Sequence, residues 1–432
     1  MVGGGKMKKI VSILLVAAMT LCLCASFTAC NGNGAASADG SIKVGAIILG
    51  DETEGYSKAH IDGIKEAAAN LGLAETDVIW KYKVPETSAA YEAAVDLVGQ
   101  GCNIIFSNSY GHQDFMKQAA EENPNVTFVA MTGDYAAISG LDNFKNAFTK
   151  VYESRYVAGV VAGLKLKELT ENGTLTAETQ PDSFDAAGNI KIGYVGAFNY
   201  AEVVSGYTAF YLGIKSVMPN VVMEVMYTNS WADIDKEGAA AEALVANGCV
   251  IIGQHADTTG APAAVQKLKD SGKICYSVGY NVDMLPTAPN AALTSATNCW
   301  SVYYEYAMKC VMDGQPVAAD FAEGYAKNGV KITGLGPECA AGTAEKVAEV
   351  EAALAAGTTH VFDTSTFTVA GATVTTAPVD LSYMDWSTMT AIYQGETVEA
   401  IVDGYFSEST FRSAPYFSLR IDGIVEDADP VQ

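Results

Sequence analysis

The chain has 432 residues, of which 49% are hydrophobic and 18% charged, and its formal net charge at pH 7 is −24. Such an excess of acidic groups disfavours nucleic acid and polyanionic ligands as partners, because the summed field of the protein repels phosphates. The length predicts two domains rather than one, each with enough apolar residues for its own core. The composition therefore favours a neutral or cationic small molecule as the ligand.

The N-terminus has the pattern of a secretory signal. Three lysines, at positions 6, 8 and 9, precede an apolar run over residues 10–25 that is too short to cross a bilayer comfortably. The run ends in small residues before Cys30, a sequence that resembles a bacterial lipobox, in which the cysteine is acylated and becomes the mature N-terminus. We therefore expect a signal peptide over residues 1–29 and a lipid-anchored protein on the extracytoplasmic face of the cell membrane. The alternatives are an ordinary signal cut near Ala29 and an uncleaved anchor, and Met7 is an alternative start.

A flexible tether over residues 30–41 follows, since this stretch is small, polar and Gly-rich. Beyond it, short β-branched runs alternate with amphipathic helical stretches. The expected strands are 42–49, 103–107, 126–131, 190–195, 221–227, 250–253 and 274–278, and the expected helices are 57–71, 113–121, 203–217, 233–246 and 261–270. Strand and helix in alternation predict parallel sheets with helices on both faces.

The two halves of this pattern match each other at a nearly constant offset. The sequence IKVG at 42–45 recurs as IKIG at 190–193, 148 positions later, and GIK at 63–65 recurs at 213–215, 150 positions later. A third match, which includes a Gly-Cys pair, has an offset of 147. The repeat predicts two lobes of one α/β fold, with a ligand cleft between the carboxyl ends of their strands.

The chain is expected to pass between the two lobes three times. Lobe one is predicted to contain residues 42–149 and 295–325, and lobe two residues 150–294 and 326–432 with the C-terminal segment. Hinges are expected near 148–151, 291–298 and 323–330. The Thr- and Val-rich runs 360–370 and 372–379 predict an antiparallel hairpin added to lobe two.

Four loops at the carboxyl ends of the strands should line the cleft: 51–57 and 108–112 from lobe one, and 198–205 and 254–260 from lobe two. With a Trp that precedes the helix at 233–246, they supply the candidate ligand residues Tyr56, Tyr110, Phe198, Asn199, Trp231, Gln254, His255 and Asp257. Aromatic faces with amide and acidic groups suit a flat, uncharged ring with polar edges.

Several motifs occur together: EGYS at 54–57, YESRYVAG at 152–159, NSWAD at 229–233, GQHAD at 253–257 and TS at 294–295. Over nearly all of the mature chain they resemble the basic membrane protein (BMP) family of ABC-transporter substrate-binding lipoproteins. The resemblance implies the type I periplasmic-binding-protein fold, two Rossmann-like parallel-sheet lobes joined by a three-strand hinge. It also implies a purine ligand, usually a nucleoside, that is handed to an ABC permease. We expect the receptor to be a monomer.

Residue roles follow from the same resemblance. Tyr56, Tyr110 and Trp231 match aromatic positions of the family's site, and Asp283 matches the acid that holds ribose hydroxyls. Nucleoside-binding members have a lysine where this chain has Asn298, and the Gln-His-x-Asp sequence resembles a branch associated with the free nucleobase. Both the free nucleobase and the nucleoside therefore remain candidate ligands.

Catalysis is the competing class of function. The sequence contains no Gly-x-Ser-x-Gly, Gly-x-Gly-x-x-Gly, P-loop or His-Glu-x-x-His motif, and its four histidines are scattered. We expect no catalytic residues, no cofactor and no metal. Core packing is expected for Cys102, Cys249 and Cys275, while export permits disulfides among the six cysteines of the body. A sugar receptor or sensor module of the same fold stays open, as does a hydrolase acting on nucleosides. Arg155 and Glu153 are expected either behind the cleft or as a surface pair.

Overall fold

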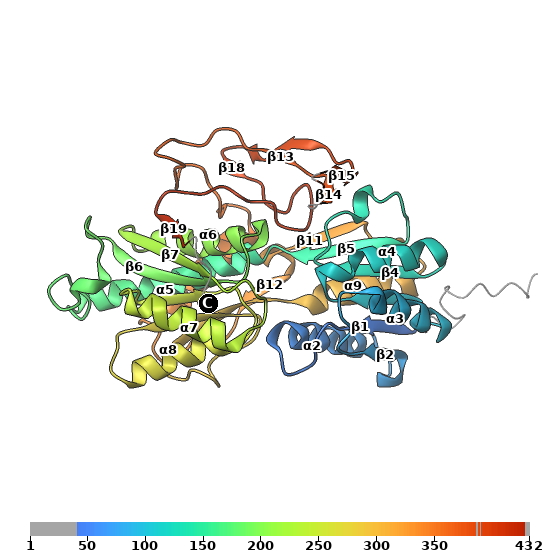
Figure 1. Cartoon of the computed structure of the whole chain (residues 1–432), viewed down its shortest axis with the longest axis horizontal. Coiled ribbons are helices and arrows are strands. Elements are labelled where there is room, and N and C mark those ends of the chain that lie inside the picture. Colours follow the sequence, from blue (N-terminus) through green and yellow to red (C-terminus); the bar gives the residue numbers. More distant parts are fainter. Residues whose placement is uncertain (1–40, 386–387, 389, 428–432) are drawn as a thin grey trace, which may run out of the picture.

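The computed structural model describes residues 41–385, 388 and 390–427, which form two lobes side by side (Figure 1). The expected signal peptide, Cys30 and the tether up to residue 40 lie outside the described residues. Within the described part of the chain, no helix is long and apolar enough to cross a membrane.

Lobe one is built on a six-stranded sheet in the order β11-β5-β4-β3-β1-β2, in which every neighbouring pair is parallel. Its strands are β1 (Val44–Ile47), β2 (Val78–Lys81), β3 (Ile104–Ser107), β4 (Thr127–Met131), β5 (Phe144–Thr149) and β11 (Asp320–Glu323). Helices α2 (Gly55–Asn70) and α9 (Trp300–Met312) cover one face, and α3 (Ser88–Gly99) and α4 (Gln113–Glu122) the other. Burial from both sides explains the continuous apolar runs of these strands.

Lobe two is built on a seven-stranded sheet in the order β12-β10-β9-β8-β6-β7-β19. Its strands are β6 (Ile190–Gly196), β7 (Val221–Tyr227), β8 (Ile251–Gln254), β9 (Tyr276–Tyr280), β10 (Ala292–Asn298), β12 (Val330–Ile332) and β19 (Ile424–Glu426). Helices α5 (Val151–Glu171) and α6 (Ala201–Lys215) cover one face, and α7 (Ile234–Ala246) and α8 (Gly260–Asp270) the other. Helix α10 (Thr343–Ala355) packs on the α5 side.

The predicted duplication is confirmed by the strand order. Lobe one contains the series β2-β1-β3-β4-β5, and lobe two contains β7-β6-β8-β9-β10 in the same relative order. The repeated sequences 42–45 and 190–193 lie on β1 and β6, the equivalent strands of the two sheets. The α/β architecture with two parallel-sheet lobes is therefore as predicted.

The chain passes between the lobes at three places. The first passage runs from β5 to α5, and the third from β11 to β12. At the second passage the structure differs from the predicted boundary, because β10 belongs to the sheet of lobe two. The chain re-enters lobe one only after Asn298, rather than at residue 295.

Residues 356–427, called here the C-terminal extension, differ more from expectation. The predicted hairpin over 360–379 does not form. Before β13 begins, the described backbone there makes isolated antiparallel bridges between Val369 and Ala372 and between Asp363 and Tyr405. Further on, three small antiparallel pairs form: β13 (Pro378–Asp380) with β16 (Thr397–Glu399), β14 (Tyr383–Asp385) with β15 (Thr390–Tyr393), and β17 (Ile401–Val402) with β18 (Tyr405–Phe406). The extension contacts both lobes rather than lobe two alone.

Cys102, Cys249 and Cys275 are buried in the apolar clusters beside β3, β8 and β9, as expected of core cysteines. The six cysteines among the described residues are all free thiols. In this same part of the chain, no cluster of His, Cys, Asp and Glu side chains could hold a metal ion.

Candidate ligand-binding site

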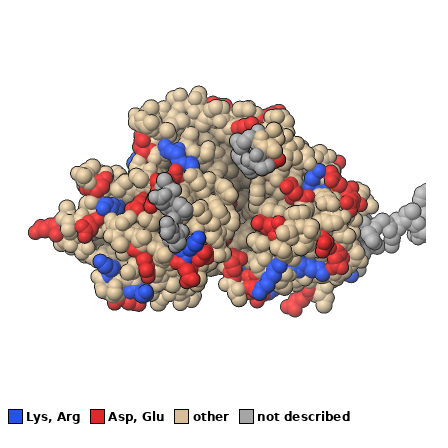
Figure 2. Space-filling view, viewed as in Figure 1, with Lys and Arg blue, Asp and Glu red and all other residues tan. Residues whose placement is uncertain are grey.

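The lobes meet at the carboxyl ends of their strands, where Thr149 at the end of β5 bonds to Asn298 at the end of β10. Figure 2 shows a groove between the two lobes. The lobes approach closely where α2 begins. A Cβ atom added at Gly55 would lie 3.0 Å from the carbonyl oxygen of Asp257 and 3.4 Å from the Val282 side chain. Glycine at this position therefore lets lobe one lie against lobe two, and the structure represents a closed arrangement.

Tyr56 is fixed against lobe one. Its hydroxyl donates to the carbonyl oxygen of Asn108 at 2.5 Å, and its ring meets the edge of His60 at 4.6 Å. His60 is stacked on Trp300, and burial lowers the pKa of its imidazole to about 3, so it is neutral at physiological pH. Tyr56 thus presents a rigid, uncharged aromatic group at the rim of lobe one.

Tyr110 lies in a short 3-10 turn, η2 (Tyr110–His112), directly after β3, and its side chain is 43% exposed. Its hydroxyl donates to Oδ2 of Asp134 at 3.3 Å. Oδ1 of Asp134 and Nε2 of the neighbouring Gln113 are buried and have no hydrogen-bond partner among the described residues. These two polar groups are therefore packed beneath Tyr110. Burial raises the pKa of Asp134, and the nearby Arg412 and Gln113 lower it. The sequence reasoning missed Asp134, although it follows a buried strand as the other candidates do.

Three aromatic side chains form one cluster at the rim of lobe two. The rings of Phe198 and Tyr200 are stacked at 5.2 Å, and Trp231 lies 5.4 Å from Phe198. Trp231 also lies 6.2 Å from the buried ring of His255. The structure thus brings together the predicted residues Phe198, Trp231 and His255, which come from three different loops.

The Gln-His-x-Asp sequence at the end of β8 is buried. Nε2 of Gln254 donates to the carbonyl oxygens of Ala256 and Thr258 at 2.7 and 2.5 Å, so the donors of this side chain brace their own loop. Oδ1 of Asp257 accepts from Nδ2 of Asn281 at 2.7 Å. Burial raises the pKa of Asp257 well above its usual value, and the nearby carboxylate of Glu54 raises it further. These contacts place Gln254 behind the cleft surface.

His255 and Glu202 join the loop to the start of α6. Nε2 of His255 lies 3.3 Å from Oε1 of Glu202, and Nδ1 lies 3.5 Å from the hydroxyl of Tyr194. Burial lowers the pKa of His255 well below 6.5 and raises the pKa of Glu202 to about 7, and Arg155 only partly offsets the latter. His255 is therefore neutral at physiological pH, and Glu202 titrates close to pH 7.

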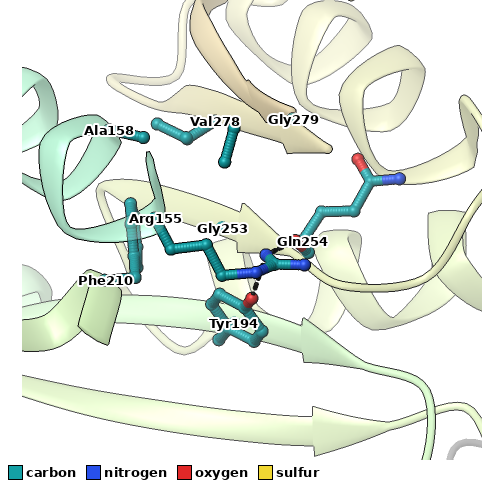
Figure 3. A pocket seen from close by; sticks show the side chains of 9 residues that line it. Arg155, Ala158, Tyr194, Phe210, Gly253, Gln254, Val278 and Gly279 are labelled. Carbon is teal, nitrogen blue, oxygen red and sulfur yellow. Dashed lines mark hydrogen bonds between the residues drawn. The ribbon is translucent and has the colours of Figure 1, made fainter. Parts of the chain in front are cut away.

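Arg155 occupies the centre of lobe two's site (Figure 3). Its Nη1 donates to the Tyr194 hydroxyl at 2.6 Å and to the Gln254 carbonyl oxygen at 2.9 Å, and its guanidinium lies 3.9 Å from the Tyr280 ring. The side chain is buried, and within the described part of the chain Nε and Nη2 have no partner. A cavity of about 10 Å³ beside it has room for one water molecule. Arg155 is therefore not part of a surface pair, and its position behind a ligand cleft stays a prediction.

Asn298, Asp283 and Asn199, the remaining predicted ligand residues, do not lie in the aromatic cluster. Oδ1 of Asn298 accepts from Thr149 Oγ1 at 2.5 Å, so this side chain links β10 to β5 at the hinge. Asp283 is exposed and its Oδ1 caps a turn by accepting from the backbone N–H of Leu285 at 3.0 Å. Asn199 is exposed and accepts from Arg420 of the C-terminal extension. The structure does not bring Asp283 to the aromatic cluster, and its role in binding ribose stays a prediction.

Comparisons with known proteins agree with this geometry. The family model described as ABC transporter substrate-binding protein PnrA-like matches residues 42–353. A purine-binding protein of Brucella abortus is 33% identical over 282 residues, which are 65% of this chain and 72% of that protein. A putative ABC transporter glucose-binding protein of Haloferax volcanii is 28% identical over 298 residues, 69% of this chain and 68% of that protein.

Among solved structures, an ABC transporter solute-binding protein from Conexibacter woesei superposes with a TM-score of 0.58 at 17% identity, covering 74% of this chain and 98% of that one. At this identity the likeness concerns the fold. The predicted type I periplasmic-binding fold is thereby confirmed.

Proposed function

The chain belongs to the family of PnrA-like ABC transporter substrate-binding proteins, and we propose that its cargo is a purine, bound as the nucleobase or as the nucleoside. The family and the fold are those of solute-binding proteins rather than enzymes. Proteins of this kind work outside the cytoplasm and hand a small molecule to an ABC permease.

The observation that carries the proposal is the aromatic cluster of Phe198, Tyr200 and Trp231 on lobe two, with Tyr56 and Tyr110 on lobe one. Aromatic faces bind a flat heterocycle by stacking and leave its edges to polar groups. A relative named for purine binding, at 33% identity, supports the same ligand class.

The polar groups near these rings suit an uncharged ligand with donors and acceptors on its edge. Asp134 and Gln113 place polar groups directly beneath Tyr110. The buried His255 stays neutral because desolvation lowers its pKa. A nucleoside would also need a carboxylate for its ribose hydroxyls, and exposed Asp283 would have to turn inward to serve. This geometry favours the nucleobase slightly over the nucleoside.

Binding is proposed to work by closure of the two lobes around the ligand. The three passages between the lobes supply the hinge, where Asn298 bonds to Thr149 across two sheets. The close approach of Gly55 to Asp257 marks the lobe contact that the closed form makes. The permease would recognise this closed form, and Cys30 would hold the receptor beside it by its lipid, which raises the effective concentration at the permease.

A sugar is the second candidate, because a relative at 28% identity is named as a putative glucose-binding protein. Sugar sites also use stacking aromatics, and this site has carboxyl groups at Glu202 and Asp257 that could accept from hydroxyls.

A thermal-shift panel of adenine, guanine, hypoxanthine, their nucleosides, glucose and arabinose separates the two candidates. A ligand that binds the folded state alone raises the melting temperature by mass action. We expect a shift with at least one purine and none with either sugar. A shift with sugars alone would overturn the purine proposal.

A further inference from the structure

The C-terminal extension lies beyond the part of the chain that the family model matches, which ends at residue 353. In the structure it runs across the top of the molecule in Figure 1, over the groove between the lobes. The extension is integrated into the core of lobe two, whereas on lobe one it makes a separate docking contact.

On lobe two the extension is part of the core. Strand β19 pairs in parallel with β7 and so completes the sheet. Phe362, Phe406 and Phe417 pack in the main apolar cluster of that lobe, with Phe362 and Phe417 stacked at 4.3 Å. Separating this end from lobe two would expose fully buried aromatic rings, so it stays attached when the lobes move.

On lobe one the described part of the extension docks without strand pairing, against the ring of Tyr135, which belongs to an apolar cluster of that lobe. The rings of Tyr383 and Tyr393 are stacked on Tyr135 at 4.2 and 5.1 Å. The Tyr383 hydroxyl also donates to Oδ2 of Asp114 at 3.1 Å. No strand of the extension pairs, within the described residues, with the sheet of lobe one. This contact can therefore break without unfolding either lobe.

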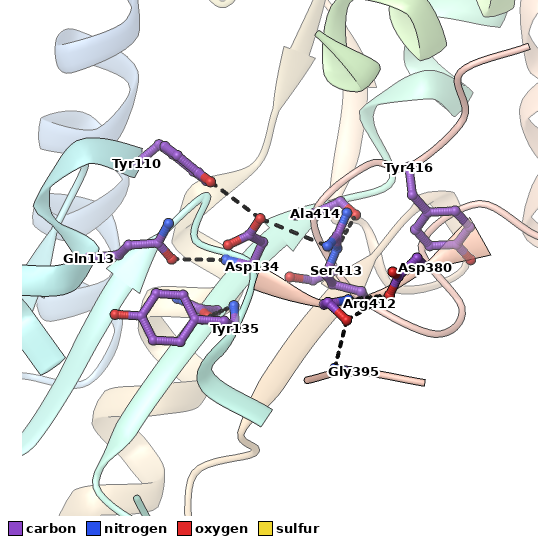
Figure 4. Close-up of polar contacts among 12 residues, drawn as sticks. Tyr110, Gln113, Asp134, Tyr135, Asp380, Gly395, Arg412, Ser413, Ala414 and Tyr416 are labelled. Atoms are coloured by element: carbon purple, nitrogen blue, oxygen red, sulfur yellow. Dashed lines mark hydrogen bonds and ion pairs between the residues drawn. The ribbon is translucent and has the colours of Figure 1, made fainter. Parts of the chain in front are cut away.

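Arg412 links the extension to the binding loop of lobe one (Figure 4). Its Nη1 lies 3.8 Å from Oδ2 of Asp134, and the two side chains are only 16% and 15% exposed. The same Asp134 oxygen accepts from the hydroxyl of Tyr110. Next to Arg412, the backbone N–H of Ser413 donates to Oδ2 of Asp320 at 2.6 Å. Arg412 thus holds the carboxylate that faces Tyr110.

Arg420 makes the corresponding link to lobe two. Its Nη2 donates to Oδ1 of Asn199, and its Nε donates to Oε2 of Glu426 at 2.8 Å. Asn199 lies between Phe198 and Tyr200, the stacked rings of the aromatic cluster. The chain has three arginines, Arg155, Arg412 and Arg420. Both arginines of the extension thus hold a loop of the proposed binding site, one on each lobe.

We propose that the C-terminal extension is an interlobe strap that positions one binding loop of each lobe, with Arg412 and Arg420 as positioning residues. Because the strap is built into lobe two, its docking on Tyr135 and Asp134 must release when the lobes separate. The docking contact therefore favours the closed arrangement and pre-organises the site, which raises affinity by increasing the binding-competent fraction. The purine affinity predicted here rests on the proposed function, whereas the effect on lobe separation does not.

The lobe separation tests the strap without any ligand. Fluorophores on azido side chains placed at exposed Lys309 in lobe one and Lys267 in lobe two report the distance by single-molecule energy transfer. We expect the ligand-free double variant Tyr383→Ala/Tyr393→Ala to show a longer mean separation than wild type. The matched control is Tyr82→Ala, which truncates an exposed tyrosine on the far side of lobe one and should leave the separation unchanged. Equal distributions in wild type and double variant would overturn the strap.

Affinity tests the positioning role, with adenine and inosine as probes in titration calorimetry on the full-length receptor. We expect Arg412→Ala to raise the Kd about fivefold or more, and Arg412→Lys, which keeps the charge beside Asp134, to recover part of the loss. If wild type binds neither probe, the purine proposal fails and the separation measurement still decides on the strap. If wild type binds and Arg412→Ala binds equally well, the positioning role is wrong.

A variant that fails to fold is replaced by a smaller change. Tyr383→Phe keeps the stacking on Tyr135 and removes only the hydroxyl bonded to Asp114. Tyr91→Phe, which removes an exposed hydroxyl bonded to Glu122, is its control. We expect faster ligand dissociation for Tyr383→Phe than for Tyr91→Phe, and equal rates would count against the strap.

Discussion

Glu237 provides a quantitative test of how the binding loop is held. This residue of α7 is fully buried beneath the loop that carries His255 and Asp257. Both its carboxylate oxygens lie 3.3 Å from the backbone N–H of Thr258, and Oε2 lies 3.4 Å from Nε2 of Gln254. Burial raises the pKa of this carboxyl to about 7, although the bonds from Thr258 lower it.

The magnitude follows from the shift in pKa. A carboxyl whose pKa lies at 4.5 in the unfolded chain and at about 7 in the folded one binds protons more tightly when folded. The stability that it contributes is fully present below pH 4.5 and is lost as the pH rises through about 7. Each pKa unit corresponds to about 1.4 kcal/mol, so the loss between about pH 5 and pH 8 is roughly 2 to 3 kcal/mol.

Glu237→Gln removes this titration while keeping the shape of the side chain. We expect the free energy of unfolding of wild type, measured by urea denaturation, to fall relative to the variant by roughly 2 to 3 kcal/mol from about pH 5 to pH 8. Glu345→Gln, at an exposed position in the first turn of α10, is the control and should follow wild type. Parallel pH profiles for wild type and Glu237→Gln would refute the reasoning.

Three further predictions concern the site and the anchor. Trp231→Ala should weaken purine binding about tenfold to a hundredfold in calorimetry, because a stacking ring is lost, while Trp80→Ala on lobe one leaves it unchanged. Arg155→Lys should lower the free energy of unfolding by about 2 to 4 kcal/mol in urea denaturation. The planar guanidinium bonds to two acceptors while it lies on the Tyr280 ring, and a compact ammonium cannot reproduce this combination. An unchanged free energy of unfolding would contradict the described contacts. Cys30→Ser should release the protein from membranes into the medium in a fractionation assay, and continued membrane association would refute the lipobox assignment.

Much of the fold was already determined by local sequence. Strands buried on both faces read as continuous apolar runs, and helices between them show a helical period, so residues 190–196 and 201–215 were predicted almost to their ends. The internal repeat located β1 and β6 as equivalent strands and so predicted two lobes. Since loops after parallel strands meet at one edge, the sequence also predicted that Phe198, Trp231 and His255 lie together.

Other features were decided only by the tertiary structure. Whether a polar side chain after a strand faces the cleft depends on the bonds that its loop makes, so Gln254 turns inward to Thr258 and Asp283 caps an exposed turn. Asn298 has its hinge position because β10 stays with lobe two, a fact set by strand pairing rather than by any local pattern.

The C-terminal extension shows most clearly that local sequence does not determine which residues a segment packs against. Its short, Thr-rich runs have no strong period, so their sequence predicted a hairpin on lobe two that the structure does not contain. Its place depends on contacts between residues far apart in the chain, such as Tyr383 with Tyr135 and Arg412 with Asp134. Local sequence indicates which residues are apolar enough to be buried. Which residues they pack against, on one lobe or on both, depends on the packing of the whole chain.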